Sequence, residues 1–466
     1  MAQRPNILIL MTDQQRADCL SCAGHPVVKT PHMDRLAAEG VRFSQAYTTS
    51  PVCMPARSSF LSGLYCHNHG QWYNYGKLPP ETQTYASDLA ALGYHTCHIG
   101  KSHYYAHEKN DHLDKHKPYL RSLGWQEAFE TTGPYATQHT DSILTDRWRK
   151  LGCLETFRDD YARRVKIGGT ATWPSPMPPG ETADDFVGRT AVDYISNYQS
   201  DDPLLLFVGF GGPHDPWDPP SDWAARYNPT EMDAAQPITA PPPWATREAA
   251  AFQEKRQPKN SPYTPEIARR IRALYYAKIS HVDDWFGRIF ASLSTRGLFE
   301  NTVIVQWSDH GEMLCDKGRI QKSVFYEQSA RVPLIVRAPG RSRGGVCSGL
   351  ASTIDVYPTL LELAGSTTPA NGFGQSLLPA LNDPTAKLRD AVFSEIDHPA
   401  RTMIRDRRHK LVVDTQGAVL KLYDLAEDPR EEINLAGKPG TERIVAELKE
   451  RMLSWYASTG NRQRDD

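Results

Sequence analysis

A short segment at residues 51–63, PVCMPARSSFLSG, places residue types that could do chemistry at close spacing. Cys53 and Arg57 flank a proline, and the chain then continues into a helix-like run. A thiol nucleophile is usually activated by a nearby histidine that lowers its pKa. This segment offers an arginine and a possible helix N-terminus instead, and both favour binding of an anion. The pattern indicates a cysteine beside an anion-binding site, with a buried structural thiol as the ordinary alternative.

Four apolar runs elsewhere in the chain each lead directly into polar residues. These runs are Asn6–Met11, Tyr94–Ile99, Leu204–Phe210 and Thr302–Trp307. Such near-continuous apolar composition is typical of parallel strands that are covered on both faces. In an open α/β sheet, ligands bind in the crevice outside the carboxyl ends of the strands. We therefore expect the polar residues that follow these runs to meet in one crevice.

The residues expected in this crevice fall into two chemical groups. One group offers mainly oxygen ligands for a divalent metal ion: Asp13, Gln14, Asp309 and His310. The other group can carry positive charge: Arg57, Lys101, His103 and His214. A metal ion and several cations around one tetrahedral oxyanion provide the electrostatic stabilisation on which phosphoryl and sulfuryl transfer depend. The sequence therefore predicts a site for that kind of substrate.

The elements that must position these residues are predicted from periodicity. Helices are expected at Pro31–Glu39, Tyr85–Leu92, Asp184–Ser196 and Pro265–Leu293. Their alternation with the four strands predicts a parallel α/β sheet. After about residue 345 the pattern changes, with helices or strands expected at Asp355–Ala364, Ala391–Ile396, Lys410–Val413, Leu420–Tyr423 and Thr441–Ser458. We thus expect a catalytic α/β domain at residues 1–345, with a proline-rich insertion at about 216–265, and a C-terminal α+β subdomain at 346–466.

Several segments, taken in order, resemble the formylglycine-dependent sulfatases of the alkaline phosphatase superfamily. The matching segments are NILILMTDQ, TPHMDRLAAEGVRFSQAYTTSPVCMPARSSFLSG, GYHTCHIGKSH, FVGFGGPHDPW, VIVQWSDHGE, QKSVFYEQSARVPLIVRAPG and KLYDLAEDPREEINLA. The C-x-P-x-R core alone is a weak motif, but the ordered set spans most of the chain and is highly specific. The resemblance implies an alkaline phosphatase-like fold, with a large mixed, mostly parallel sheet flanked by helices.

The resemblance also implies a reaction. A maturation enzyme would oxidise Cys53 to formylglycine, and one hydroxyl of the hydrated aldehyde would attack the sulfur of a small-molecule or saccharide sulfate ester. The resulting covalent sulfo-enzyme would release sulfate when the second hydroxyl loses its proton. The implied activity is hydrolysis of a sulfate ester to an alcohol and inorganic sulfate.

Roles carried over by position complete the implied site. Arg57 would stabilise the gem-diol, His103 would be the base for its second hydroxyl, and His214 would protonate or hydrogen-bond the leaving alcohol. The implied substrate-binding residues are Lys101 and Lys322, with Asn74 as a further candidate. The implied metal ligands are Asp13, Gln14, Asp309, His310 and the modified Cys53. Calcium is the expected ion, although Gln14 and His310 depart from the usual carboxylate and asparagine, and a nitrogen ligand suits manganese as well.

Ordinary structural interpretations compete with several of these roles. Asp13 could cap the following segment, and the prolines around His214 could simply fix a loop histidine. Lys322 could be a solvated loop charge, and Asn74 could bind its own backbone, as turn asparagines commonly do.

Two other functions remain open from the sequence. A phosphonate monoester or phosphodiester hydrolase could use the same aldehyde chemistry, although the Lys101 and His103 pair favours sulfate. An inactive protein that binds sulfated ligands is the third possibility, against which the intact set of site residues argues.

Bulk composition excludes some partners. Lys and Arg total 53 against 55 Asp and Glu, so the chain is nearly neutral, which argues against a nucleic-acid or anionic membrane partner. The apolar run Ile7–Met11 is too short to span a bilayer and no cleavage site follows it. We therefore expect a soluble, cytoplasmic protein, with its eight scattered cysteines mostly reduced.

Overall fold

A large sheet forms the centre of the protein in a computed structural model that describes residues 4–247, 263–397 and 400–460. Its eight strands are ordered β4-β3-β5-β1-β6-β7-β2-β8. They are β1 (Asn6–Asp13), β2 (Val41–Tyr47), β3 (His95–Gly100), β4 (Glu127–Glu130), β5 (Leu204–Pro213), β6 (Thr302–Ser308), β7 (Leu334–Arg337) and β8 (Val346–Ser352). Only β7 runs antiparallel to its neighbours, β6 and β2. The predicted fold class, a mixed and mostly parallel sheet, is confirmed.

The four predicted strands are β1, β3, β5 and β6, and they lie side by side in the middle of this sheet. All their mutual pairings are parallel, with Ile9 opposite both Phe207 and Val305. Their carboxyl ends therefore meet at one edge of the sheet, as the crevice argument requires.

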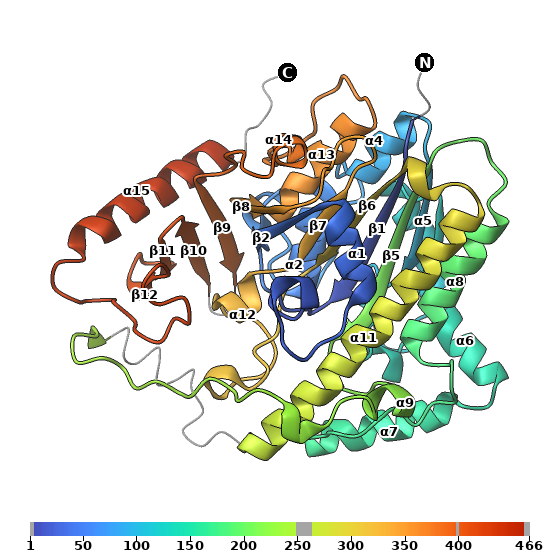
Figure 1. Ribbon diagram of the computed structural model, residues 1–466, viewed down its shortest axis with the longest axis horizontal. Coiled ribbons are helices and arrows are strands. Elements are labelled where there is room, and N and C mark those ends of the chain that lie inside the picture. The colour runs from blue at the N-terminus through green and yellow to red at the C-terminus, as the bar shows by residue number, and fades with distance from the viewer. Residues whose placement is uncertain (1–3, 248–262, 398–399, 461–466) are drawn as a thin grey trace.

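Helices cover both faces of the sheet. Alternate side chains of β1 enter different cores, with Ile7 and Ile9 on one face and Leu8 and Leu10 on the other. The second face packs against α1 (Pro31–Glu39), α8 (Ala183–Asn197) and α11 (Pro265–Thr295), which lie together in Figure 1. The first face packs against α2 (Cys53–Ser62), α4 (Tyr85–Ala91) and α13 (Val356–Leu363). The helices predicted from periodicity are thus confirmed.

The remaining helices are short or peripheral. They are α3 (Cys66–His69), α5 (Lys117–Ser122), α6 (Ile143–Lys150), α7 (Leu154–Ile167), α9 (Ser221–Ala224), α12 (Glu327–Ala330) and α14 (Leu378–Asn382). The predicted proline-rich insertion falls partly outside the described residues; its longer described part, residues 216–247, contains α9 and a short 3-10 helix at Pro229–Glu231.

A second, antiparallel sheet lies towards the C-terminus, at the left of Figure 1. Its order is β12-β11-β10-β9, with β9 (Ala391–Ile396), β10 (Arg401–Asp406), β11 (His409–Asp414) and β12 (Val419–Asp424). Helix α15 (Glu442–Thr459) packs on it through Leu448, Met452 and Trp455. Because β8 follows residue 345 yet pairs with β2 in the large sheet, we keep the two-domain division as a proposal and take the small sheet as the core of the second part.

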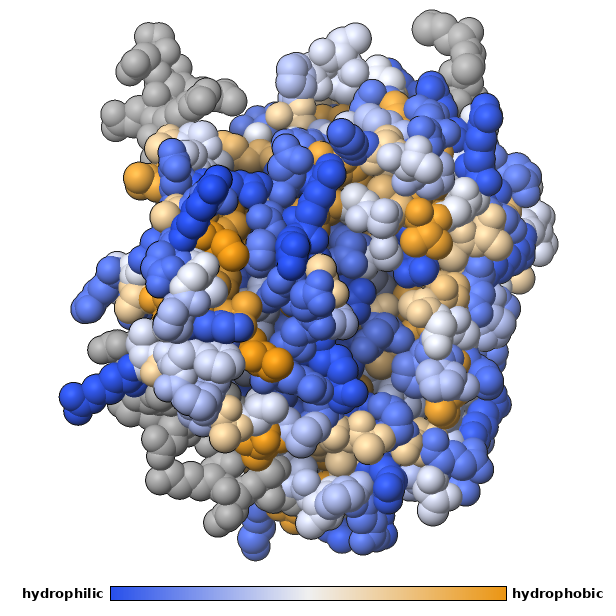
Figure 2. Space-filling view, turned by 60° about the vertical axis from the view of Figure 1, so that its left-hand side comes forward, coloured by the Kyte–Doolittle hydropathy of each residue, from blue (hydrophilic) through white to orange (hydrophobic). Residues whose placement is uncertain are grey.

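The surface seen in Figure 2 is mainly hydrophilic, with hydrophobic residues in small separate patches. Across the parts of the chain that the structure describes, no helix has the length and apolar character needed to cross a membrane.

Candidate active site

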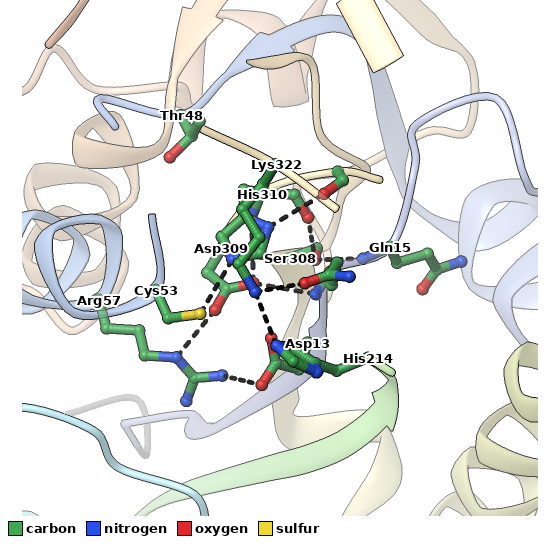
Figure 3. A network of polar contacts seen from close by, with 12 residues as sticks. Asp13, Gln15, Thr48, Cys53, Arg57, His214, Ser308, Asp309, His310 and Lys322 are labelled. Atoms are coloured by element: carbon green, nitrogen blue, oxygen red, sulfur yellow. Dashed lines mark hydrogen bonds and ion pairs between the residues drawn. The ribbon is translucent and has the colours of Figure 1, made fainter. Parts of the chain in front are cut away.

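The crevice at the carboxyl ends of the strands holds a compact buried cluster (Figure 3). Asp13 ends β1, Asp309 and His310 follow β6, and Cys53 begins α2. One potential ligand atom from each of these four residues lies within 4.8 Å of the others, and all four residues are buried. The structure thus brings together four of the five residues predicted to bind metal, three of them at strand ends and Cys53 at the start of α2.

The donor set fits a divalent metal ion. Two carboxylates, a thiol and an imidazole converge, and Asp13 Oδ1 is buried without a hydrogen-bond partner among the described residues. Burial would raise the pKa of Asp13, but Lys101 opposes it and the carboxyl pKa ends well below its ordinary value. A buried, ionised carboxylate oxygen that no protein donor satisfies is the position that a cation would fill.

Gln14 lies beside this cluster, with its side-chain amide in a separate polar network. Its Oε1 accepts a hydrogen bond from Lys322 Nζ at 2.5 Å, and its Nε2 donates to Asp215 Oδ1 at 3.2 Å and to Glu312. Its backbone N–H donates to Asp309 Oδ1 at 3.0 Å from a left-handed conformation, φ 67°. The Gln14 Oε1 atom uses one lone pair on Lys322 and keeps a second that an ion could use. The role of Gln14 as a metal ligand therefore stays a prediction.

Cys53 sits in a strongly positive environment. Its Sγ is 3.1 Å from His310 Nε2, and the residue is 1% exposed. Burial alone would raise the pKa of the thiol, but Lys322 and Lys101 outweigh it and hold this pKa well below its ordinary value. Position 53 therefore favours a negatively charged group, in agreement with the anion site expected from the sequence.

Arg57 ties the two carboxylates of the cluster together. Its Nε donates to Asp309 Oδ2 at 2.9 Å, its Nη2 lies 3.3 Å from Asp13 Oδ2, and its Nη1 donates to the Lys101 carbonyl at 2.7 Å. One turn of α2 separates Arg57 from Cys53, so the guanidinium fixes the helix start to the strand ends. A buried arginine of this kind is stable only because both carboxylates face it.

Lys101 and His103 follow β3 and approach the cluster from the side of Asp13. Lys101 Nζ pairs with Asp13 Oδ2. The pKa of His103 is lowered to about 3, chiefly by burial and then by Lys101, while the nearby Cys53 side chain acts in the opposite direction. His103 is consequently neutral near pH 7, and its lowered pKa makes it a weak base in the state seen here. It also adopts a left-handed backbone, φ 54°, which is uncommon outside glycine and clusters at functional sites.

His214 and Lys322 face each other on the opposite side. Lys322 Nζ is 2.7 Å from His214 Nε2, and His214 Nδ1 is 2.5 Å from the Asp215 carbonyl oxygen. Since an ammonium can only donate, His214 Nε2 accepts a hydrogen bond from Lys322. His214 Nδ1 therefore carries the ring proton and donates a hydrogen bond to the Asp215 carbonyl oxygen. The lysine and histidine therefore share one small volume beside Gln14.

Asn74 serves the backbone of α2 in this structure. Its Oδ1 accepts the Met54 N–H at 3.0 Å, one of the orphan donors in the first turn of the helix. This contact is structural but differs from the alternative expected, since it is made to a residue 20 positions away and not to the backbone of Asn74 itself; a substrate-binding role for Asn74 stays a prediction.

Two acidic residues that sequence reasoning had not selected hold the network together. Glu312 is fully buried, and its Oε1 accepts the backbone N–H groups of Leu314 and Gln321. Asp215 Oδ2 accepts from Gln321 Nε2 at 3.1 Å, while its Oδ1 binds Gln14. Asp215 directly follows His214 in PHDPW, and Glu312 lies two residues after His310 in SDHGE. This closeness to predicted site residues was the sequence feature that could have identified them.

The small sheet supports the segment that carries Lys322. Lys410 of β11 is fully buried, and its Nζ lies 2.9 Å from the Phe325 carbonyl, 2.6 Å from Glu327 and 2.8 Å from Glu431. Breaking a buried pair of this kind leaves an uncompensated charge. The C-terminal part of the chain thus helps to place a residue of the site.

Comparisons with known proteins show the family of the chain. The family model described as Sulfatase matches residues 5–366, and the model described as N-sulphoglucosamine sulphohydrolase, C-terminal, matches residues 315–458. An arylsulfatase of Clostridium perfringens is 30% identical over 93% of this chain and 90% of its own. An ulvan-active sulfatase of Formosa agariphila is 28% identical over 98% of this chain and 82% of its own. A solved phosphonate monoester hydrolase of Agrobacterium radiobacter superimposes with a TM-score of 0.79 at 26% identity, covering 98% of this chain and 96% of its own.

Proposed function

Because the chain belongs to the sulfatase family of sulfuric ester hydrolases, we propose that it converts a sulfate ester into an alcohol and inorganic sulfate with residue 53 as nucleophile. The observation that carries the proposal is the clustering of two carboxylates, a thiol and an imidazole within 4.8 Å. Two lysines, Lys101 and Lys322, lie close enough to lower the pKa of the Cys53 thiol. This combination suits a small anionic tetrahedral group at the N-terminus of α2.

The proposed cofactor is one divalent metal ion. The residues that would hold it are Asp13, Asp309, His310 and residue 53, with Gln14 as an additional oxygen donor. When bound, the ion would neutralise charge on a sulfate oxygen and lower the pKa of a hydroxyl on residue 53.

The proposed modification is oxidation of Cys53 to formylglycine by a separate maturation enzyme. The hydrated aldehyde would supply one hydroxyl to attack sulfur and a second whose deprotonation expels sulfate. Arg57, held against both carboxylates, would keep positive charge beside these hydroxyls. His103, which follows β3 at the site and is neutral, would accept the proton of the second hydroxyl, and this role needs its pKa to rise when the negative sulfate group is bound beside it.

Substrate contacts are assigned to the remaining cations. Lys101 and Lys322 would bind sulfate oxygens, and Lys322 would leave the Nε2 of His214 when it turns to the substrate. His214 would then be protonated on both ring nitrogens, with Nδ1 still facing Asp215, and would donate from Nε2 to the leaving oxygen. The alcohol half is proposed to be a small molecule or a saccharide, the latter by analogy with the ulvan-active relative.

A comparison of two substrates tests this proposal. We would co-express the chain with a formylglycine-generating enzyme and measure kcat/KM for nitrophenyl sulfate and for the matching phosphonate monoester, with calcium and with manganese. The expected preference for sulfate is at least about tenfold, or ~1.4 kcal/mol of transition-state stabilisation. A higher kcat/KM for the phosphonate would instead assign the chain to the activity of the Agrobacterium enzyme that its fold resembles.

The choice of metal ion is expected to depend on His310. Its Nε2 faces the cluster while its Nδ1 lies 3.0 Å from the Gly311 carbonyl, so the ring presents nitrogen to the ion. In a His310→Asn variant, an oxygen ligand would replace this nitrogen and raise the ratio of calcium-supported to manganese-supported kcat/KM by about tenfold, ~1.4 kcal/mol. Metal-depleted protein reloaded with each ion gives the ratio, and a ratio equal to that of the unsubstituted enzyme would contradict the assignment.

A further inference from the structure

The loop that carries His214 is held from behind by two buried charged side chains. One is Lys278, in the middle of α11, with a side chain that is 6% exposed. Its Nζ donates to the carbonyls of His214 and Pro216, each at 3.0 Å, and to Asp218 Oδ1 at 2.8 Å. An ammonium has three protons, and all three are used on residues 214–218.

The second charged residue is Asp184, near the start of α8. Its Oδ1 accepts the backbone N–H groups of Gly211 at 2.9 Å and Gly212 at 3.0 Å, at the end of β5. Burial raises the pKa of Asp184, and the nearby charge of Lys278 opposes that rise. The carboxylate therefore holds the chain just before His214, and the ammonium holds it at and just after His214.

This arrangement is more than core packing requires. A buried charge costs several kcal/mol of desolvation, which apolar residues of similar volume would avoid. Charge-assisted hydrogen bonds to backbone atoms instead give a fixed loop conformation. Here that conformation sets the direction of one imidazole, because His214 Nδ1 is tied to the Asp215 carbonyl and Nε2 faces Lys322.

We propose that Lys278 is a positioning residue for His214, acting together with Asp184 across the α8–α11 pair. It touches neither the metal cluster nor residue 53 in any contact of the described residues, so its effect on turnover passes through the His214 loop. The proposal rests on the function given above to His214, donation to the leaving oxygen. The contribution of Lys278 is therefore specific to substrates whose leaving group needs that donation.

A series of aryl sulfates with phenols of increasing pKa tests the proposal. Lys278→Met retains the length of the side chain and removes its donors. We expect it to lower kcat/KM by about 100-fold for phenyl sulfate and by less than about threefold for nitrophenyl sulfate. The plot of log kcat/KM against phenol pKa should become steeper, as it should for His214→Asn. The double variant should be no slower than His214→Asn alone, because both substitutions remove the same interaction.

Matched variants separate positioning from general damage. Ser280 lies on the same helix, and its Oγ donates to the Lys29 carbonyl at 2.6 Å. Ser280→Ala therefore removes a comparable hydrogen bond to backbone, and the slope of its plot should equal that of the unsubstituted enzyme. Lys278→Arg, which keeps the charge and donors, should recover part of the loss for phenyl sulfate. If Lys278→Met unfolds, Asp218→Ala removes one acceptor of the ammonium from a partly buried position and should steepen the same slope.

The outcomes are distinguishable. Equal losses across all phenols, or losses that multiply in the double variant, would overturn the positioning role while leaving the sulfatase proposal in place. Turnover of neither aryl sulfates nor saccharide sulfates by the fully modified, unsubstituted enzyme would overturn both.

Discussion

Replacing Cys53 with alanine is expected to lower kcat/KM for a sulfate ester by about 10⁴-fold or more while the protein remains folded. The large loss follows because residue 53 would be the only nucleophile, and the surrounding cations can bind substrate without cleaving it. The fold should survive because the hydrogen bond of this sulfur to His310 Nε2, at 3.1 Å, lies inside the site itself. Loss of one buried sulfur costs about 1 kcal/mol.

The measurement pairs kinetics with thermal unfolding. Cys97→Ala is the matched control, because Cys97 is also fully buried but lies within β3, in the core against α8. It should lose similar stability and retain turnover. Activity of Cys53→Ala within tenfold of the unsubstituted enzyme would eliminate the nucleophile assignment, and retained ligand binding without any turnover difference would favour the inactive binding protein.

Replacing Asp309 with asparagine is the second large effect, with an expected loss of bound metal and about 10³-fold or more of kcat/KM. The carboxylate accepts from three donors, the N–H groups of Gln14 and His310, each at 3.0 Å, and Arg57 Nε at 2.9 Å. An amide would place an NH₂ against one of those donors and remove one of the two negative charges that would bind the ion.

Metal content per chain and thermal unfolding with and without chelator give the readout. A bound ion stabilises the folded state by mass action, so chelation should lower the Tm of the unsubstituted enzyme but not that of Asp309→Asn. The control is Asp316→Asn, since Asp316 is equally buried between Arg16 and Arg272 but outside the cluster. It should lose about 3 kcal/mol of stability and keep its metal; full metal occupancy in Asp309→Asn would refute the site.

The central strands could be predicted because both their faces are covered. A run such as NILILM is almost continuously apolar, so it is not mistaken for a surface strand with alternating polar residues. The same holds for β5 and β6. Strand β10, RTMIRD, was missed because it carries polar residues that become buried only through tertiary contacts, as when Arg405 Nε donates to Tyr47. Such contacts leave no periodic signal in the sequence.

Which residues lie in the candidate site could be predicted from the strand ends, but the hydrogen bonds among them could not. Topology alone brings Asp13 and Asp309 together once β1 and β6 pair in parallel. Whether the Gln14 amide faces an ion or Lys322, and whether Asn74 faces substrate or Met54, depends on hydrogen-bond competition among neighbours. Side-chain identity fixes what each group can donate or accept but not which partner is in reach.

The contact between Cys53 and His310 joins residues 257 positions apart in the chain. During synthesis at about 5–20 residues per second, Cys53 is therefore made tens of seconds before β6 and His310, which follows that strand. A chain made only as far as residue 63 still lacks β6 and His310, whereas in the finished protein every residue of α2 is buried. If Cys53 is modified as proposed, a maturation enzyme would reach it most easily in the interval before β6 and His310 are made.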